Sequence, residues 1–461
     1  MSNCRRILAI VLATLGLNFA LVAQETEPAP ERSTPPPAAV TSSEDNSPSA
    51  EDVRPDVRPI TGLLPLTVGS FGTERSFVAP SLRFSESLDT NPLLATGASD
   101  DVAVVNVSGN VLLQRVWRQS QLSMNYTTGG SLYAGQSDLN RSFQAAQIKQ
   151  AFQFRRWSLA LLDDMTYTPE SIFGYAGTAG LATSSFTQGT APNQTILNNQ
   201  SQQITNTAGA QANYELNSRS SITVAGDYAL LRFPAGNFLE SNQAGFQVGY
   251  NHSLNSRDAL GISYGMGWIW YPNPAIAPAV DSHIVQLTYG RKVTGRLALR
   301  LSAGPEIYAF DNSVAGSTNH SSWIAHGALT YRFQHSQLDV GYSHTLSTGA
   351  GVLALVRTDQ FEGGFSSQLT RTVSAHLRAG YAHNLNLQQL PGSTDIAFET
   401  VFIDAGLTRP MGRNADVFLK YSLQYQSANL ASCGLEVCVG DLTRHIAELG
   451  FDWHMRPILI H

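Results

Sequence analysis

The stretch DALGISYGMGWIWYP, residues 258–272, alternates between two kinds of side chain. Its large apolar residues occupy every second position: Leu260, Ile262, Tyr264, Met266, Trp268 and Trp270. The positions between them hold mostly small or polar residues, such as Gly261, Ser263, Gly265 and Gly267. Successive side chains of a β-strand point to opposite faces, so this pattern predicts a strand with one apolar face and one small, polar face.

The same alternation recurs from about residue 74 to the end of the chain. It predicts an all-β fold of about 18 strands, with 16 as the alternative count. The expected strands are 76–88, 101–115, 119–133, 141–155, 157–168, 200–216, 220–232, 238–254, 258–271, 280–292, 296–309, 320–334, 336–347, 355–370, 373–387, 396–409, 414–427 and 441–456.

The connections between these strands alternate in length. Short turns recur about every 40 residues, for example LNSRS at 216–220 and VTGR at 293–296. Longer connections lie between them, near 168–200, 271–281, 310–320, 386–397 and 427–441. Short periplasmic turns and long external loops are typical of a transmembrane antiparallel β-barrel. The alternative is a soluble β-propeller or sandwich, whose exposed faces would carry more charge.

The composition agrees with a barrel and argues against other classes. Charged residues make up 14% of the 461 residues, well below the roughly 25% of soluble globular proteins. Mean hydropathy is −0.11, and no run of about 20 apolar residues follows the N-terminus, which argues against a helical membrane protein. The chain holds only three Lys, so nucleic acid is not an expected partner.

The N-terminal region divides into two segments before the barrel. Residues 1–23 are typical of a signal peptide, with Arg5 and Arg6 before an apolar stretch; a membrane-anchoring helix is the alternative. Residues 24–70 form an acidic, Pro-rich segment, which we expect to be disordered in the periplasm, because residues 24–59 carry eight Pro and a net charge of −5. Residues 71–461 are then the expected outer-membrane barrel.

Cysteine and histidine offer little catalytic chemistry. Cys433 and Cys438 are the two cysteines beyond the signal peptide. A disulfide within one loop explains that spacing better than a metal site, which would need more ligands. No nucleophile elbow, phosphate loop or paired Cys-His metal spacing is present in the sequence. We therefore expect neither an enzyme, nor a cofactor, nor a metal.

Two groups of charged residues are candidates for solute contact. One group falls on the polar face of the strands and is expected to face the lumen: Arg300, Arg332, Arg378, Lys420, Asp227, Asp339 and Glu362. The other marks the short turns and is expected at the periplasmic rim: Arg118, Arg156, Arg219, Arg257, Arg296, Arg371 and Arg413. The rim either attracts an anionic solute or consists of solvated residues that anchor the barrel at the headgroups.

The size of the barrel favours a pore. A barrel of 16–18 strands leaves an aqueous channel unless something fills it. The longest connection, 169–199, either folds inward as a constriction or covers the outer mouth. The sequence therefore favours a passive aqueous pore for hydrophilic solutes. The alternatives are a plugged structural or binding barrel tethered to periplasmic or cell-wall partners, and a lipid-modifying enzyme embedded in the barrel.

The first strand carries a family resemblance. SFVAPSLRFSESLDTNPLL, residues 76–94, resembles the opening of outer-membrane β-barrel porins associated with exopolysaccharide systems. In those proteins an alternating strand is followed by an Asp/Asn pair and an aliphatic residue, here Asp89, Asn91, Leu93 and Leu94, with Thr90 interposed. The resemblance implies the bacterial outer membrane, a link to polysaccharide export, and three kinds of partner: membrane lipids, the barrel-assembly machinery and a hydrophilic solute or anionic polysaccharide.

Overall fold

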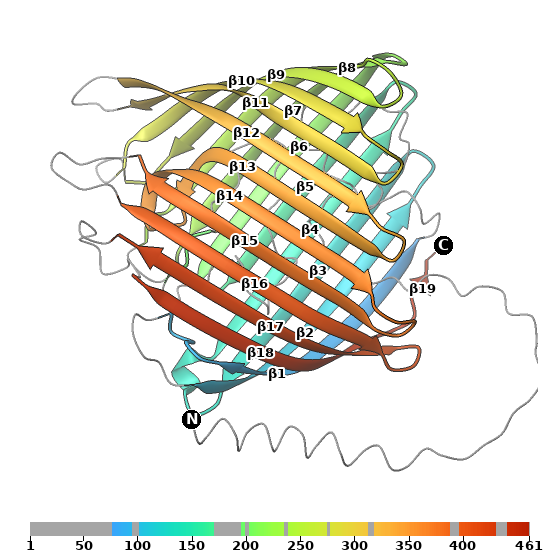
Figure 1. Ribbon diagram of the computed structural model, residues 1–461, viewed down its shortest axis with the longest axis vertical. Coiled ribbons are helices and arrows are strands. Elements are labelled where there is room, and N and C mark those ends of the chain that lie inside the picture. Colours follow the sequence, from blue (N-terminus) through green and yellow to red (C-terminus); the bar gives the residue numbers. More distant parts are fainter. Residues whose placement is uncertain are drawn as a thin grey trace, which may run out of the picture. The chain divides into compact units, whose positions relative to one another are not determined.

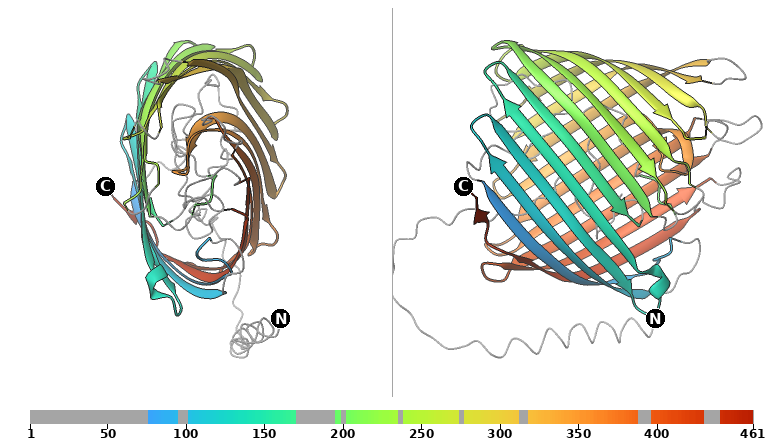
Figure 2. Two further views of the ribbon diagram at one scale, coloured as in Figure 1. Left: turned by 90° about the vertical axis from the view of Figure 1, so that its left-hand side faces the viewer. Right: turned by 180° about the vertical axis from the view of Figure 1, so that it is seen from behind.

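The chain folds into antiparallel strands that surround a lumen (Figures 1 and 2). The computed structural model describes residues 76–94, 101–169, 195–198, 202–234, 238–273, 277–311, 318–387, 396–429 and 440–460. The strands are β1 (Phe77–Asp89), β2 (Val102–Val116), β3 (Ser120–Tyr133), β4 (Arg141–Gln153), β5 (Trp157–Thr168), β6 (Gln203–Asn217), β7 (Ser220–Arg232), β8 (Ser241–Ser253), β9 (Asp258–Trp270), β10 (Ala279–Lys292), β11 (Leu297–Asp311), β12 (Thr318–Arg332), β13 (Ser336–Gly349), β14 (Leu353–Gln368), β15 (Ser374–Asn386), β16 (Ala397–Pro410), β17 (Ala415–Ala428), β18 (Leu442–His454) and β19 (Ile458–Leu459).

The sheet closes on itself through its first strand. Strands β1 to β18 each pair with their neighbours in the chain, and β1 also pairs with β18 from Ser81↔His454 to Asp89↔Ile446. The predicted closed barrel of 18 strands is thereby confirmed. After β18 the chain adds one feature that the sequence analysis did not predict: Ile458 and Leu459 pair with Val78 and Phe77 and extend the seam.

Alternation along each strand separates the lumen from the outer surface. On β7, Thr223 and Asp227 are buried, whereas Val224 and Tyr228 are 39% and 40% exposed on the outer face. A soluble barrel would bury its large apolar residues inside, but here they face outward and small polar residues face inward. This arrangement suits a hydrocarbon environment around the barrel and water within it.

Tyrosine pairs mark both edges of the apolar outer band. Towards the long connections, the Tyr264 hydroxyl lies 2.8 Å from Nδ1 of His283 on the adjacent strand. Towards the short turns, Tyr289 donates to Asp258 over 2.7 Å. Between these two rows lie aliphatic side chains such as Leu287, which is 64% exposed. Aromatic rings with a polar tip settle at membrane–water interfaces, so the two rows define the apolar band that the lipid covers.

The two ends of the barrel differ in their connections (Figure 1). Short turns occupy one end, at 117–119, 154–156, 218–219, 254–257, 293–296, 333–335, 369–373 and 411–414. The long connections occupy the other end, including 134–140, which carries a 3₁₀ turn at Ser137–Leu139. Within the described ranges, no helix has the length and apolar character needed to cross a membrane.

Candidate functional site: a constriction inside the barrel

The hairpin formed by β13 and β14 leaves the barrel wall near the long-connection end. The pairing of β12 with β13 stops at Ala325↔His344, whereas β13 and β14 stay paired as far as Gly349↔Leu353. Residues 345–355, here called the inward hairpin, therefore bend away from β12. Figure 2, left, looks into the barrel from the end with the long connections and shows this hairpin curving into the interior.

The inward hairpin packs against the inner face of β9–β11. Leu346 and Leu355 belong to one apolar cluster with Ile269, Tyr271 and Tyr308, which come from the opposite side of the contact. Leu355 is completely buried, with 0% exposure. The contact between hairpin and wall is therefore built like a small hydrophobic core, which holds the hairpin across part of the lumen.

Three polar contacts hold the tip of the hairpin. Gln243 Nε2 donates to Thr348 Oγ1 over 3.1 Å, and the Leu239 amide donates to the Gly351 carbonyl over 2.7 Å. The Tyr271 hydroxyl donates to the carbonyl of Ala354. Burial raises the pKa of the Tyr271 phenol, so the group stays protonated and remains a donor.

Gly351 is required at the tip for two reasons. Its φ of +81° lies in the left-handed region that side chains disfavour. A Cβ at this position would also lie 2.4 Å from ring atoms of Phe233. The tip therefore approaches the β7–β8 connection as closely as its backbone allows.

Residues 195–198 form a second element inside the barrel. Gln426 on β17 holds Leu197 from both sides, accepting from its amide over 2.7 Å and donating to its carbonyl over 3.0 Å. Thr195 donates to Asn384 on β15 over 3.0 Å, and Asn198 donates to the Ala350 carbonyl at the hairpin tip over 3.2 Å. For these four residues the inward alternative for the connection 169–199 is correct.

The two elements form one constriction. Ile196, which has 0% exposure, packs with Val352, Leu353 and Val356 of the hairpin region and with Phe398 of β16. Wall residues on β8 and β15–β17 thus hold an inner structure made of 195–198 and 345–356. This inner structure, called the constriction, occupies part of the cross-section of the lumen.

Replacing Gln426 with Ala should release residues 195–198. The change leaves the amide and carbonyl of Leu197 without their side-chain partner in a buried site, which costs about 2 kcal/mol or more. Hydrogen–deuterium exchange of residues 196–198 should accelerate by about tenfold or more, because each 1.4 kcal/mol is a factor of ten. Thr400→Val is the matched control, since Thr400 contacts Gln426 only over 3.4 Å. If hydrogen–deuterium exchange is unchanged in Gln426→Ala, the two hydrogen bonds of Gln426 do not hold residues 195–198 in place.

The contacts at the end of β1 show what the Asp/Asn and aliphatic residues of the stretch 76–94 do in the fold. Asp89 accepts the Asn91 amide over 3.0 Å and also receives Nε of Arg444 over 3.0 Å. Asp89 and Arg444 are 2% and 1% exposed. After this turn Leu94 packs against Leu197 and Leu442. The motif residues thus join the closing seam of the barrel to the inner segment 195–198.

The structure places the seven charged residues predicted for the lumen on the inward alternation of their strands. Lys420 is 6% exposed, lies in register with Glu448 and has its Nζ 5.5 Å from the centre of the Phe418 ring. Asp339 accepts a hydrogen bond from Thr330 Oγ1 over 2.9 Å, and Glu362 accepts one from the side-chain Nε2 of Gln360. The others are Arg300, Arg332, Arg378 and Asp227. They are spread around the wall, and their role in solute passage stays a prediction.

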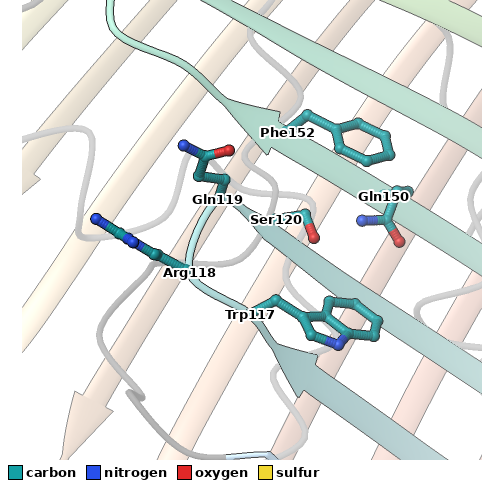
Figure 3. Close-up of a pocket in the computed structure, with 6 residues that line it drawn as sticks. All are labelled: Trp117, Arg118, Gln119, Ser120, Gln150 and Phe152. Atoms are coloured by element: carbon teal, nitrogen blue, oxygen red, sulfur yellow. The ribbon is translucent and has the colours of Figure 1, made fainter.

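The seven arginines predicted for the rim lie in the short turns, and all are exposed: Arg118, Arg156, Arg219, Arg257, Arg296, Arg371 and Arg413. Beside the first of them is a hollow of about 620 Å³, lined by Trp117, Arg118, Gln119, Ser120, Gln150 and Phe152 (Figure 3). Trp117, Ser120, Gln150 and Phe152 face this hollow, whereas Arg118 extends from the turn in the other direction. By strand alternation the hollow lies on the outer surface, not in the lumen.

Several predictions from the sequence concern parts of the chain outside the described residues. These are the signal peptide 1–23, the segment 24–70 and the disulfide between Cys433 and Cys438. Within the described ranges, no group of three or more His, Cys, Asp or Glu side chains is arranged to hold a metal ion.

The inward hairpin was not predicted from the sequence, although a signal for it exists. Residues 352–356, VLALV, are apolar without interruption, in contrast to the alternation elsewhere. A short continuous apolar run is typical of a strand buried on both faces. In this barrel only a segment inside the lumen can be buried in that way.

Comparison with known proteins finds similar folds. No family model matches the chain, and no curated protein matches it. The crystal structure of Pseudomonas aeruginosa OccK2 (OpdF) in complex with glucuronate is 10% identical, with coverage of 83% of this chain and 98% of that chain and a TM-score of 0.43. P. aeruginosa OpdQ is 10% identical over 84% and 100%, with a TM-score of 0.45. Acinetobacter baumannii OccAB1 is 10% identical over 85% and 100%, with a TM-score of 0.42.

Identities of this order leave the lumen to be interpreted from its own residues. The fold itself defines the class. A closed antiparallel barrel with an even number of strands, an apolar outer band and aromatic rows at its edges is the form in which proteins cross the bacterial outer membrane. The chain is a β-barrel protein of that membrane.

Proposed function

We propose that the barrel is a passive aqueous pore for hydrophilic solutes, narrowed by the inward hairpin and residues 195–198. The observation that supports this most is the polar inner wall of an 18-strand barrel. Buried inward residues on successive strands include Thr205, Thr207, Thr223, Gln247, Asn251, Ser263, Gln286 and Ser302. A barrel of this size is too wide for wall side chains alone to fill, so water occupies what the inner structure leaves free.

Passage of a solute through such a pore is diffusion and involves no chemical reaction. A hydrophilic solute exchanges its hydration for hydroxyl, amide and charged groups along the wall, and the remaining cross-section beside the constriction limits its size. Charges of both signs line the wall, so the size limit should weigh more than the net charge of the lumen. A second candidate function, a plugged barrel that binds partners, is favoured by the firm anchoring of 195–198.

Single-channel conductance separates the two functions. We expect the refolded protein to give stable steps in a planar bilayer, smaller than those of an unobstructed barrel of equal strand number, because the inner structure removes part of the cross-section. Folding is checked by the shift in electrophoretic mobility between unheated and heated samples. Folded protein without steps would contradict the pore and favour the plugged barrel.

An anionic polysaccharide is the solute class that we propose for the rim. Support comes from the resemblance of the first strand and from the seven exposed arginines at one end. An acidic oligosaccharide added on the short-turn side should block the current. Changing Arg156, Arg219 and Arg257 to Gln should weaken this block about tenfold at low salt, since charge steering acts over about 10 Å at 0.1 M salt.

The matched control is a neutral oligosaccharide of equal length, whose effect should be the same in both proteins. If the block by the acidic oligosaccharide is unchanged in the Gln variant, the rim arginines are solvated anchors only.

A further inference from the structure

The seam between β12 and β13 is interrupted near the long-connection end. β12 pairs with β11 all the way to Phe310↔Thr318, but with β13 only as far as Ala325↔His344. Beyond that pair the inward hairpin turns into the lumen. Among the described residues, 318–324 of β12 therefore have no strand partner on the side of β13. Strand edges in a closed barrel are normally paired, so the wall lacks inter-strand hydrogen bonds along this part of the seam.

An aromatic stack covers the end of this gap that lies next to the last β12–β13 pair, Ala325↔His344. The Trp323 ring lies parallel to the His344 ring, with a centroid distance of 3.8 Å and an angle of 8°. Trp323 is 49% exposed on the outer face, whereas His344 is 3% exposed. His344 Nδ1 in turn lies 2.6 Å from Asp359 Oδ1 on β14. The stack therefore links β12 to the base of the inward hairpin, at the level of the aromatic row that lies towards the long connections.

The wall behind the gap is apolar. Ile269, Val280 and Tyr308 are inward residues of β9–β11 that pack against Leu346 and Leu355. In a purely hydrophilic pore these positions would be polar, as Thr205 on β6 and Gln243 on β8 are. When the hairpin moves away, this wall can accommodate an apolar chain, whose contacts replace those that the wall made with Leu346 and Leu355.

We propose that the β12–β13 seam is a lateral portal for single-chain amphiphiles, molecules with one acyl chain and a small polar head. They pass between the lumen and the membrane leaflet at the long-connection end. The seam widens past Ala325 and His344, Trp323 moves aside, and the acyl chain takes the place of the hairpin against Ile269 and Tyr308. This activity goes beyond the passage of hydrophilic solutes along the barrel axis and does not depend on it.

Photolabelling tests the portal. The full protein, refolded in lipid vesicles, is irradiated with palmitic acid that carries a diazirine near the end of its chain, and the labelled residues are mapped by mass spectrometry. We expect labels on the inner residues Leu346, Leu355 and Tyr308 in addition to the outer band. Trp323→Ala should increase the inner labelling. Labels confined to outward residues such as Leu301 and Ile307 would overturn the proposal.

A disulfide across the seam provides the sharper test. Gly327 and Tyr342 are register neighbours on β12 and β13, so Gly327→Cys with Tyr342→Cys can form a bridge, in a background where Cys433 and Cys438 are Ser. Inner labelling should be lost in the oxidised protein and restored by reduction. The control pair Leu287→Cys and Ala303→Cys bridges β10 and β11 and should leave labelling unchanged.

Ion conductance keeps the two functions apart. Both oxidised variants should conduct like the unmodified protein if axial passage is independent of the seam. Inner labelling that persists in the locked seam overturns the portal, whatever the conductance. Absence of conductance with normal, seam-dependent labelling would contradict the proposed aqueous pore and leave the portal standing.

Discussion

Leu355→Asp is expected to raise the single-channel conductance about threefold or more, because it should expel the inward hairpin from an 18-strand lumen. Leu355 has 0% exposure within the apolar cluster of hairpin and wall. A carboxylate without a partner at such a site costs several kcal/mol, more than the few polar contacts at the tip provide. The hairpin then moves into the water of the lumen or out of the mouth.

Leu355→Met is the matched control, since it keeps an apolar side chain of similar volume and should leave the conductance unchanged. Conductance in planar bilayers is the measurement, with the unheated electrophoretic mobility as the check that the barrel is closed. A folded Leu355→Asp protein with the conductance of the unmodified chain would show that the hairpin does not limit the pore.

Arg444→Met is expected to produce the largest loss of stability, about 3–5 kcal/mol, because it leaves Asp89 buried without its partner. The pair lies at the seam where β1 meets β18, so the loss weakens closure of the barrel. The measurement is urea unfolding in lipid vesicles, followed by tryptophan fluorescence. The double change Asp89→Asn with Arg444→Met should recover most of the loss, since neither buried charge of the pair then remains.

Arg83→Met is the control for the same seam. Arg83 binds Asp452 over 2.7 Å, but the two side chains are 24% and 27% exposed, so removal should cost only about 1 kcal/mol. Equal losses in Arg83→Met and Arg444→Met would mean that burial of the ion pair does not determine its contribution.

The barrel could be predicted from the sequence because its determinants are local. Leu260, Ile262 and Tyr264 alternate with Gly261 and Ser263, and this period places each side chain on one face without knowledge of any other strand. The even strand number followed from the same pattern and the turn spacing, and the structure confirms it. The resemblance of residues 76–94 pointed to the correct membrane, while its link to polysaccharide export remains a proposal.

The constriction could not be predicted in the same way because its contacts join distant parts of the chain. In the sequence, Gln426 is one of many inward amide side chains, and only the fold places it beside Leu197. Likewise, Leu355 has the pattern of an ordinary strand residue, and only the bend of the hairpin buries it. Whether a loop enters a lumen depends on the wall that meets it, and that wall comes from several strands. The barrel follows from the sequence alone, because its period repeats on every strand. What fills the lumen, and where the wall lacks strand pairing, depends on long-range packing that only the folded chain brings together.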